Sequence, residues 1–190
     1  LLKQGRLEKA EQVMREQFGD SVEALPEQLQ QFYYFQKGMI RLVAGDTASA
    51  ARLIEQAVSD DSEQTWNGQQ IMFMTISSAL QSATGNVELA EQRLSNAERA
   101  VRRARINGVD DANIYYTESS IYALRGNIQD ALEKLRIAYE RGFRQLWLMD
   151  LDSRLDALRR EPQFVAIKEQ IEQDIVQART EVESLVVAAL

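Results

Sequence analysis

The sequence predicts an all-α protein, a right-handed α-α solenoid of helix hairpins that is closed by a C-terminal capping helix. Three observations predict this fold. Glycines that can end a helix recur at a nearly fixed interval, small residues recur at matching places around each glycine, and the last 29 residues carry one long apolar stripe. Only 2 prolines and 9 glycines occur in 190 residues, which argues against a chain rich in loops.

The turn glycines set the repeat. They are spaced 40, 40 and 41 residues apart, at Gly5, Gly45, Gly85 and Gly126. Glycine can adopt the left-handed conformation that closes a helix, and the residue after it, Asp46, Asn86 or Asn127, can cap the next helix with its side chain. Arg6 breaks this rule in the first copy. We therefore predict two helices joined by a tight turn in each copy.

Small residues mark where the two helices of each copy should cross. Alanines recur five and twelve residues after the turn glycines, at Ala10, Ala50, Ala57, Ala90, Ala97, Ala131 and Ala138. Seven residues before the last three glycines stand Gly38, Ser78 and Ser119. Because the distance between packed helices depends on the side chains at their contact, these positions predict a close crossing.

The chain divides into four copies and a closing segment. The copies span residues 1–24 (partial), 25–61, 62–108 and 109–142, and capping helices occupy residues 143–190. We expect Pro26 in the first turn of a helix, where the missing N–H of proline costs nothing. Asp110 or Asp111 should open the first helix of the fourth copy.

These features resemble the tetratricopeptide repeat (TPR) family. Besides the glycines and alanines, Tyr34 and Tyr115 stand where the family favours an aromatic residue, and Tyr122 matches its tyrosine near the end of the first helix. The resemblance covers about residues 1–142. The period of 40 or 41 exceeds the usual 34, and the proline that commonly closes each repeat is absent. HEAT-like repeats are the alternative, although they lack the turn rule.

A second resemblance concerns the segment from Arg141 to Ile167. It is similar to the stretch that closes TPR regions in some bacterial signalling proteins, most clearly at Glu161-Pro162-Gln163-Phe164. Those proteins join such repeats to a winged-helix DNA-binding domain, a nucleotide cyclase or a protein kinase. The resemblance implies a non-catalytic region of a larger bacterial signalling or regulatory protein. The expected compartment is the cytoplasm, or the periplasm if the parent protein is a membrane-anchored regulator.

Composition excludes several kinds of site. The chain has no Cys and no His, so it lacks cysteine nucleophiles, thiolate ligands, and the commonest general base and transition-metal ligand. Its net charge of -7 disfavours direct nucleic-acid binding, because phosphate contacts need clustered positive charge. The sequence contains no run of roughly 18 apolar residues, so it does not predict a membrane span. The chain also lacks a phosphate-binding glycine loop and paired catalytic carboxylates. We therefore expect that it is not an enzyme and binds no metal or cofactor.

Several conspicuous residues have structural explanations. Asp150 and Asp152 lack the further oxygen ligands of a calcium loop, so we predict that they cap a helix. We predict that the large rings of Trp66 and Trp147 fill the core. The one basic cluster comprises Arg99, Arg102, Arg103 and Arg105. We predict a solvated face that pairs with nearby carboxylates, and the alternative is a contact with phosphate or an acidic peptide.

The TPR resemblance implies a concave binding surface lined by the first helices of successive repeats. The groove-facing places of the family fall on Phe32, Phe35, Met39, Met72, Thr75, Asn113, Tyr116 and Ser120. We therefore expect a protein or peptide partner. The alternative is a sensor that binds a small molecule in the concave face and controls an attached output domain. Phe32 and Phe35 have the competing explanation of packing on helices of the first copy.

The C-terminal helix should run from about Pro162 to Leu190. Its apolar residues follow steps of three and four, at Phe164, Ile167, Ile171, Ile175, Ala178, Val182, Leu185 and Ala189. The first half of this stripe can cover the last repeat, and the second half should overhang with apolar surface uncovered. Two alternatives could cover this apolar surface. The helix could pair with the same helix of a second chain to form a homodimer, or it could fold back along the solenoid.

Overall fold

The computed structural model describes residues 7–19, 21–59 and 68–188. These residues form α-helices and short 3-10 helices and contain no strand, which confirms the predicted all-α class. The chain separates into two compact units, unit 1 from Leu1 to Val109 and unit 2 from Asp110 to Leu190, which are described separately below. None of the helices in the described ranges has both the length and the apolar composition needed to cross a bilayer.

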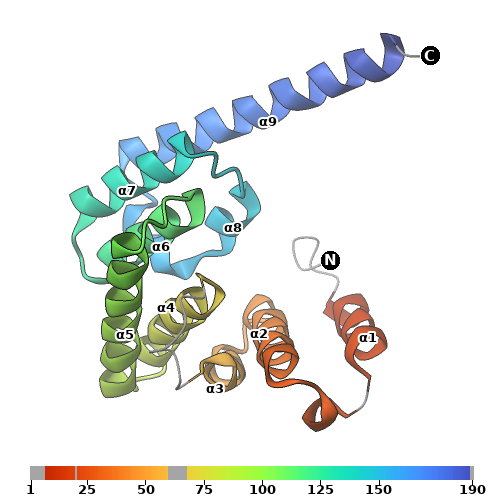
Figure 1. The fold of residues 1–190 in the computed structure, drawn as a ribbon, viewed down its shortest axis with the longest axis vertical. Helices are drawn as coiled ribbons and strands as arrows, with labels where there is room; N and C mark the ends of the chain where they lie inside the picture. Colours follow the sequence, from red (N-terminus) through yellow and green to blue (C-terminus); the bar gives the residue numbers. More distant parts are fainter. Residues whose placement is uncertain (1–6, 20, 60–67, 189–190) are drawn as a thin grey trace. The chain divides into compact units, whose positions relative to one another are not determined.

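Unit 1 contains two helix pairs and one preceding helix (Figure 1). Its elements are α1 (Leu7–Phe18), the 3-10 helix η1 (Val22–Ala24), α2 (Glu27–Val43), α3 (Thr47–Ala57), α4 (Gly68–Ala83) and α5 (Val87–Ile106). Helices α2 and α3 form one pair and α4 and α5 the next, while α1 packs against α2 and α3 against α4. The predicted turn at Gly5 and the side chain of Trp66 lie outside the described residues.

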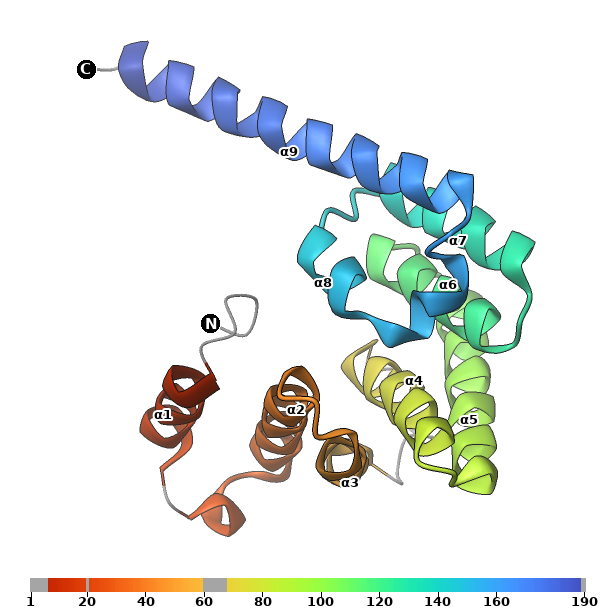
Figure 2. The same ribbon diagram turned by 180° about the vertical axis from the view of Figure 1, so that it is seen from behind.

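Unit 2 joins the fourth hairpin to the C-terminal helices (Figure 2). Its elements are α6 (Ala112–Leu124), α7 (Ile128–Glu140), α8 (Leu146–Leu151), the 3-10 helix η2 (Ser153–Leu158) and α9 (Pro162–Ala188). Helix α6 packs against α7 and η2, and α9 packs against α7 and α8. The predicted division at residue 142 therefore lies within unit 2.

The turn glycines close the hairpins as predicted. Gly45 has a φ of 82°, and Gly85 and Gly126 have φ of 87° and 77°. The N–H of Gly45 donates to the carbonyl of Leu42 (3.0 Å), and the N–H of Asp46 donates to the carbonyl of Arg41 (2.9 Å). This is the Schellman arrangement, which satisfies carbonyls at the end of a helix. An added Cβ at Gly45 would meet no atom within 4 Å, so the positive φ itself is what favours glycine there.

The capping prediction is confirmed at Asp46 and is wrong at the two asparagines. Asp46 Oδ1 accepts a hydrogen bond from the backbone N–H of Ser49 (3.0 Å). Asn86 and Asn127 precede α5 and α7, but neither side chain caps its helix. The Asn86 amide donates to Gln81 Oε1 instead (2.8 Å). A charged carboxylate interacts more strongly than an amide with the positive end of the helix dipole, which favours capping by aspartate.

Two further helix starts follow the sequence closely. Asp111 caps α6, and its Oδ1 accepts from the backbone N–H groups of Asn113 (2.8 Å) and Ile114 (2.9 Å). Pro26 is the N-cap of α2, one position before the first turn in which we predicted it, with an extended ψ of 145°. Such boundary shifts of one residue do not change the hairpin.

The predicted crossing residues lie between the paired helices. The contact at the crossing differs among the three complete pairs. A Cβ added at Gly38 would lie 2.5 Å from Ile54 Cγ1, so only glycine fits the present packing. Ser78 Oγ donates to the carbonyl of Ala90 (2.8 Å). The Ser119 hydroxyl is buried without a hydrogen-bond partner among the described residues. The six repeat alanines of the second helices are buried, namely Ala50, Ala57, Ala90, Ala97, Ala131 and Ala138.

The long helix α9 divides as its stripe predicts. Phe164 and Ile171 are buried, whereas Val182 and Leu185 are 59% and 70% exposed. Figure 1 shows the C-terminal turns of α9 extending past the end of α7. The overhang is confirmed for the described residues, which end at Ala188. The prediction for Trp147 is wrong, because this side chain is 41% exposed on the short helix α8.

Candidate binding site

The structure buries most of the side chains that we predicted on a concave surface. The buried ones are Phe35, Met39, Thr75, Tyr116 and Ser120. Phe32 and Met72 are half-buried, and Asn113 is exposed at the start of α6. Phe32, Met72 and Asn113 are therefore the members that offer free surface in this structure.

The groove-facing residues predicted in unit 1, which we call its inner positions, pack on neighbouring helices. The Phe35 ring of α2 stacks on Phe73 of α4, with centroids 4.3 Å apart and planes 23° apart. The Phe32 ring lies 6.2 Å from the Phe18 ring of α1. Packing on the first copy thus explains Phe32, whereas Phe35 packs on the third copy. On α4, Thr75 Oγ1 donates to the carbonyl of Met72 (2.9 Å), so its hydroxyl is used within its own helix.

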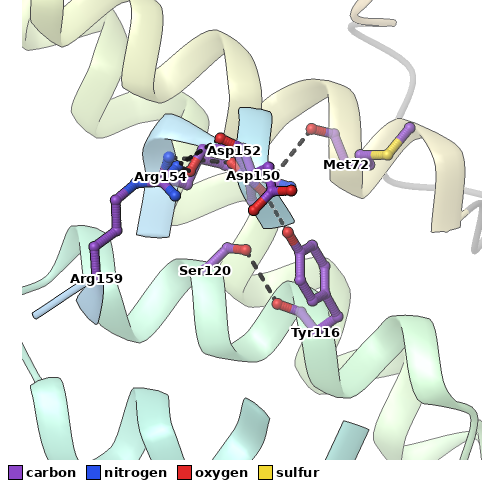
Figure 3. Close-up of polar contacts among 8 residues, drawn as sticks. Met72, Tyr116, Ser120, Asp150, Asp152, Arg154 and Arg159 are labelled. Carbon is purple, nitrogen blue, oxygen red and sulfur yellow. Dashed lines mark hydrogen bonds and ion pairs between the residues drawn. The ribbon is translucent and has the colours of Figure 1, made fainter. Parts of the chain in front are cut away.

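In unit 2 the inner position holds a buried polar cluster formed by Tyr116, Asp152 and Arg154 (Figure 3). The Tyr116 hydroxyl donates to Asp152 Oδ2 (2.7 Å), and its ring stacks on Phe143 at 4.2 Å and 10°. Arg154 donates from Nε to Asp152 Oδ1 (2.7 Å) and from Nη2 to Asp152 Oδ2 (2.5 Å). Ser120 Oγ donates to the Tyr116 carbonyl (3.0 Å). The cluster fixes η2 onto α6.

The protonation states in this cluster are set by burial and mutual contact. Burial by itself raises the pKa of Asp152, but the charge and hydrogen bonds of Arg154, with the Tyr116 hydroxyl, outweigh it and hold that pKa below its ordinary value. Burial, aided by the Asp152 charge, raises the pKa of Tyr116 well above its ordinary value. The pair is therefore charged and the phenol protonated near neutral pH. The Asp152 carboxylate accepts hydrogen bonds from both Tyr116 and Arg154, which indicates a structural role.

The two aspartates that we predicted as caps have different roles. Asp152 is the N-cap of η2, since its Oδ1 accepts from the backbone N–H of Arg154 (3.1 Å), so that prediction is confirmed. Asp150 lies within α8 and caps no helix, so the prediction is wrong there; its exposed carboxylate accepts from Lys168 Nζ of α9 (2.6 Å). Among the described residues, no three acidic side chains are grouped so that they could hold a metal ion. The sequence analysis missed the ion pair, although an N-cap aspartate followed two residues later by arginine is a usable signal.

A second polar cluster, formed by Glu55, Ser77 and Arg93, lies in unit 1. Glu55 Oε1 accepts from Arg93 Nε (2.9 Å) and also from Arg93 Nη2, and Glu55 Oε2 accepts from Ser77 Oγ (2.5 Å). The three residues come from α3, α4 and α5. Like the cluster in unit 2, this one links helices and directs its charges at each other.

The basic cluster on α5 is largely solvated, as the favoured interpretation predicts. Arg99, Arg102 and Arg103 are exposed. Arg99 Nη2 donates to Asn96 Oδ1 (2.6 Å), and Arg105 Nη1 donates to the carbonyl of Val109 (3.2 Å). Arginines in the last turn also interact favourably with the negative end of the helix dipole. A structural role at the C-terminal end of α5 therefore accounts for part of the cluster.

A small cleft of about 300 Å³ lies between α1 and α2 in unit 1. Its lining residues are Glu11, Met14, Arg15, Gly19, Tyr33, Lys37, Ile40 and Arg41. Arg41 pairs with Glu11 (3.1 Å), and Lys37 Nζ donates to the Tyr33 hydroxyl (3.0 Å). With three cations and one carboxylate, the cleft has the charge to attract a small anion. The sequence analysis did not find it, because its residues share no motif.

Comparison of the chain with protein-family models, curated proteins and solved structures finds no match. The resemblance to TPR proteins therefore rests on the turn glycines, the paired alanines and the crossing residues. The function is therefore inferred from the sequence and structure of this chain alone.

Proposed function

We propose that this chain is a non-catalytic protein-interaction module of the TPR type, within a larger bacterial signalling or regulatory protein. The observation that carries the proposal is the common plan of three helix pairs, each with a left-handed turn glycine and buried alanines on its second helix. Repeated helix pairs of this kind commonly provide extended binding surfaces. The buried polar clusters of both units link helices, which supports a scaffold role.

Within unit 2, we place the partner contact at the exposed start of α6. Asn113 lies there as the second residue of the helix, after Ala112. An uncharged amide in such a place suits hydrogen bonds to the backbone of a peptide. In unit 1 the corresponding free positions are Phe32 of α2 and Met72 of α4, which offer apolar contact.

The test is quantitative capture of proteins from a bacterial lysate by the immobilised chain, followed by measurement of affinity for the captured protein. Asn113→Lys should weaken that affinity at least tenfold, because it places a charge in the contact. Gln129→Lys is the matched control, since Gln129 is also an exposed second residue of its helix, α7. Equal affinities for Asn113→Lys and Gln129→Lys would contradict the placement, and failure to capture any protein specifically would contradict the proposal.

The cleft between α1 and α2 supports a second candidate function, a sensor of a small anionic ligand. Arg15, Lys37 and Arg41 line it. In this case a carboxylate or phosphate ligand would bind unit 1 and change its contacts with an output domain. A polar cleft of about 300 Å³ is at the small end of ligand pockets.

The sensor candidate is tested by thermal unfolding with inorganic phosphate and with a set of small carboxylates, at constant ionic strength. A binding anion should raise the unfolding temperature with its concentration, because it binds the folded state. Lys37→Gln should abolish that rise. Lys9→Gln, at an exposed position of α1 outside the cleft lining, should preserve it. If no anion raises the unfolding temperature, the sensor candidate is wrong.

A further inference from the structure

The exposed end of α9 carries the heptad pattern of a two-stranded coiled coil. In heptad notation Ile175 and Val182 occupy a positions, and Ala178 and Leu185 occupy d positions. β-branched residues at a together with leucine at d favour parallel dimers. Val182 and Leu185 are more than half exposed, so this seam lacks a partner within the described part of unit 2.

A groove runs along the same face of α9. It has a volume of about 530 Å³ and is lined by Arg144, Asp174, Ile175, Ala178, Arg179, Val182 and Glu183. Most of the seam residues thus line a hollow beside the loop that follows α7. Knobs of a second helix pack into such hollows between side chains.

The flanking charges match a parallel arrangement. Asp174 stands at the g position before Ile175, and Arg179 stands at the following e position. In a parallel pair, g of one helix lies beside the next e of the other, five residues on, so each Asp174 would meet Arg179 of the second copy. Arg179 is exposed and makes no ion pair with any described residue. Asp174 is held in place by Arg144 Nη2 (2.8 Å) and the Tyr139 hydroxyl (3.2 Å).

An antiparallel arrangement fits less well. It brings like flanking positions together, so that with the stripes overlapped Arg179 lies beside Arg179 of the second copy. Glu181, at the other flank, would likewise meet Glu181. Like charges at such close positions destabilise a helix pair, and Arg179 would gain no acidic neighbour.

We propose that two copies of this chain associate through α9 as a parallel, in-register two-stranded coiled coil, with Val182 and Leu185 in its seam and Asp174–Arg179 pairs at its edge. The proposal goes beyond the interaction module described above, because it names a second copy as one partner. About two heptads form the contact, which is smaller than the roughly 1,200 Å² of a standard stable interface. The dimer should therefore be weak, with a dissociation constant in the micromolar range.

Two valines on different faces of α9 provide a matched test. Val182, in the seam, is 59% exposed and Val176, at the b position, is 62% exposed. Sedimentation equilibrium of the whole chain should show a monomer–dimer equilibrium. Val182→Asp should raise the dissociation constant tenfold or more, because it buries a charge without a partner, while Val176→Asp should leave it unchanged. Arg179→Glu should raise it a few-fold, because it places two acidic groups together.

Orientation is tested by oxidation of single-cysteine variants, since the chain has no cysteine of its own. In a parallel in-register pair the two copies of residue 185 face each other, within the short distance that a disulfide requires. Leu185→Cys should therefore form a covalent dimer quickly. Val176→Cys, on the outer side of α9, gives the background rate of random collision.

The outcomes separate the proposal from its rivals. A chain that stays monomeric up to high micromolar concentration, or equal dissociation constants for Val182→Asp and Val176→Asp, would overturn it. So would dissociation by Val182→Asp without selective cross-linking of Leu185→Cys, because the pair would then have another orientation. Circular dichroism should show equal helicity in both aspartate variants. None of these results bears on Asn113, so failure of the dimer leaves the capture experiment independent.

Discussion

Two hairpins of this chain have the same turn geometry but different side-chain chemistry on their first helices. They are the hairpin of α2 and α3 in unit 1 and the hairpin of α6 and α7 in unit 2. Both turn at a left-handed glycine, ten residues after the inner positions Phe35 and Tyr116. Phe35 stacks on a second phenylalanine, whereas Tyr116 donates to one member of a buried ion pair. The hairpin geometry therefore depends on a few local residues, whereas the residue at the inner position can have either apolar or ionic neighbours. The two hairpins should respond to different perturbations.

The largest effect should follow from Arg154→Ala in unit 2. This change leaves the Asp152 carboxylate buried without its cation, and breaking a buried pair in this way typically costs about 3–5 kcal/mol. Urea denaturation should report the loss, and hydrogen exchange should locate it in α6 and η2. Arg136→Ala is the control, because Arg136 pairs with Glu133 and Glu140 on the exposed side of α7 and its loss should leave the midpoint nearly unchanged. Similar midpoints for both variants would show that the cluster does not hold η2 on α6.

In unit 1 the matching perturbation is steric. Gly38→Ala should destabilise the chain by about 1–3 kcal/mol, since its Cβ would lie 2.5 Å from Ile54 Cγ1 at the crossing of α2 and α3. Ile54→Ala removes the clashing atom, so Gly38→Ala should cost clearly less in that background. A double-mutant cycle measured by urea denaturation gives this coupling. Additive effects would mean that the crossing tolerates a Cβ by moving the backbone.

The same contrast explains which features the sequence could predict. The turn at Gly45, the cap at Asp46 and the buried alanines are properties of short segments, and they are as predicted. The stripe of α9 has a helical period along its whole length, so its buried and exposed halves could also be anticipated. Periodicity fails in short elements, which is why the exposure of Trp147 on the six-residue helix α8 was missed.

The candidate site could be predicted far less well. A helical repeat identifies residues on the inner side of a helix, but it does not say what covers them. Tyr116 and Asp152 are 36 residues apart, and Glu55 and Arg93 are 38 apart. Such pairs depend on the distance at which neighbouring helices pack, which no local pattern encodes. The inner positions were therefore expected to be free surface, whereas Phe35 and Tyr116 are buried.

Acid should weaken unit 2 through its ion pair. The pKa of Asp152 in the folded chain lies below its ordinary value of 3.8, so its ionisation contributes fully above about pH 4 and is lost as the pH falls through the folded pKa. Hydrogen exchange of α6 and η2 peptides should therefore accelerate below about pH 4, after correction for the intrinsic rate. Asp152→Asn, already less stable at neutral pH, should show a smaller further change. An equally steep acid response in that variant would assign the effect to other carboxylates.

The smallest contrast concerns the two residues that follow the turn glycines. Asp46 caps α3 by accepting from the N–H of Ser49, whereas Asn127 precedes α7 without a side-chain cap. Asp46→Ala should therefore lower the urea midpoint measurably at neutral pH, and Asn127→Ala should not. The hydrogen bonds with Ser49 hold the pKa of Asp46 below its ordinary value of 3.8, so the penalty of Asp46→Ala should persist down to about pH 4 and diminish below it. Since both residues occupy the same place after a left-handed glycine, equal midpoints would mean that turn geometry alone starts the second helix. A difference that vanishes in acid would instead assign the start of α3 to its carboxylate.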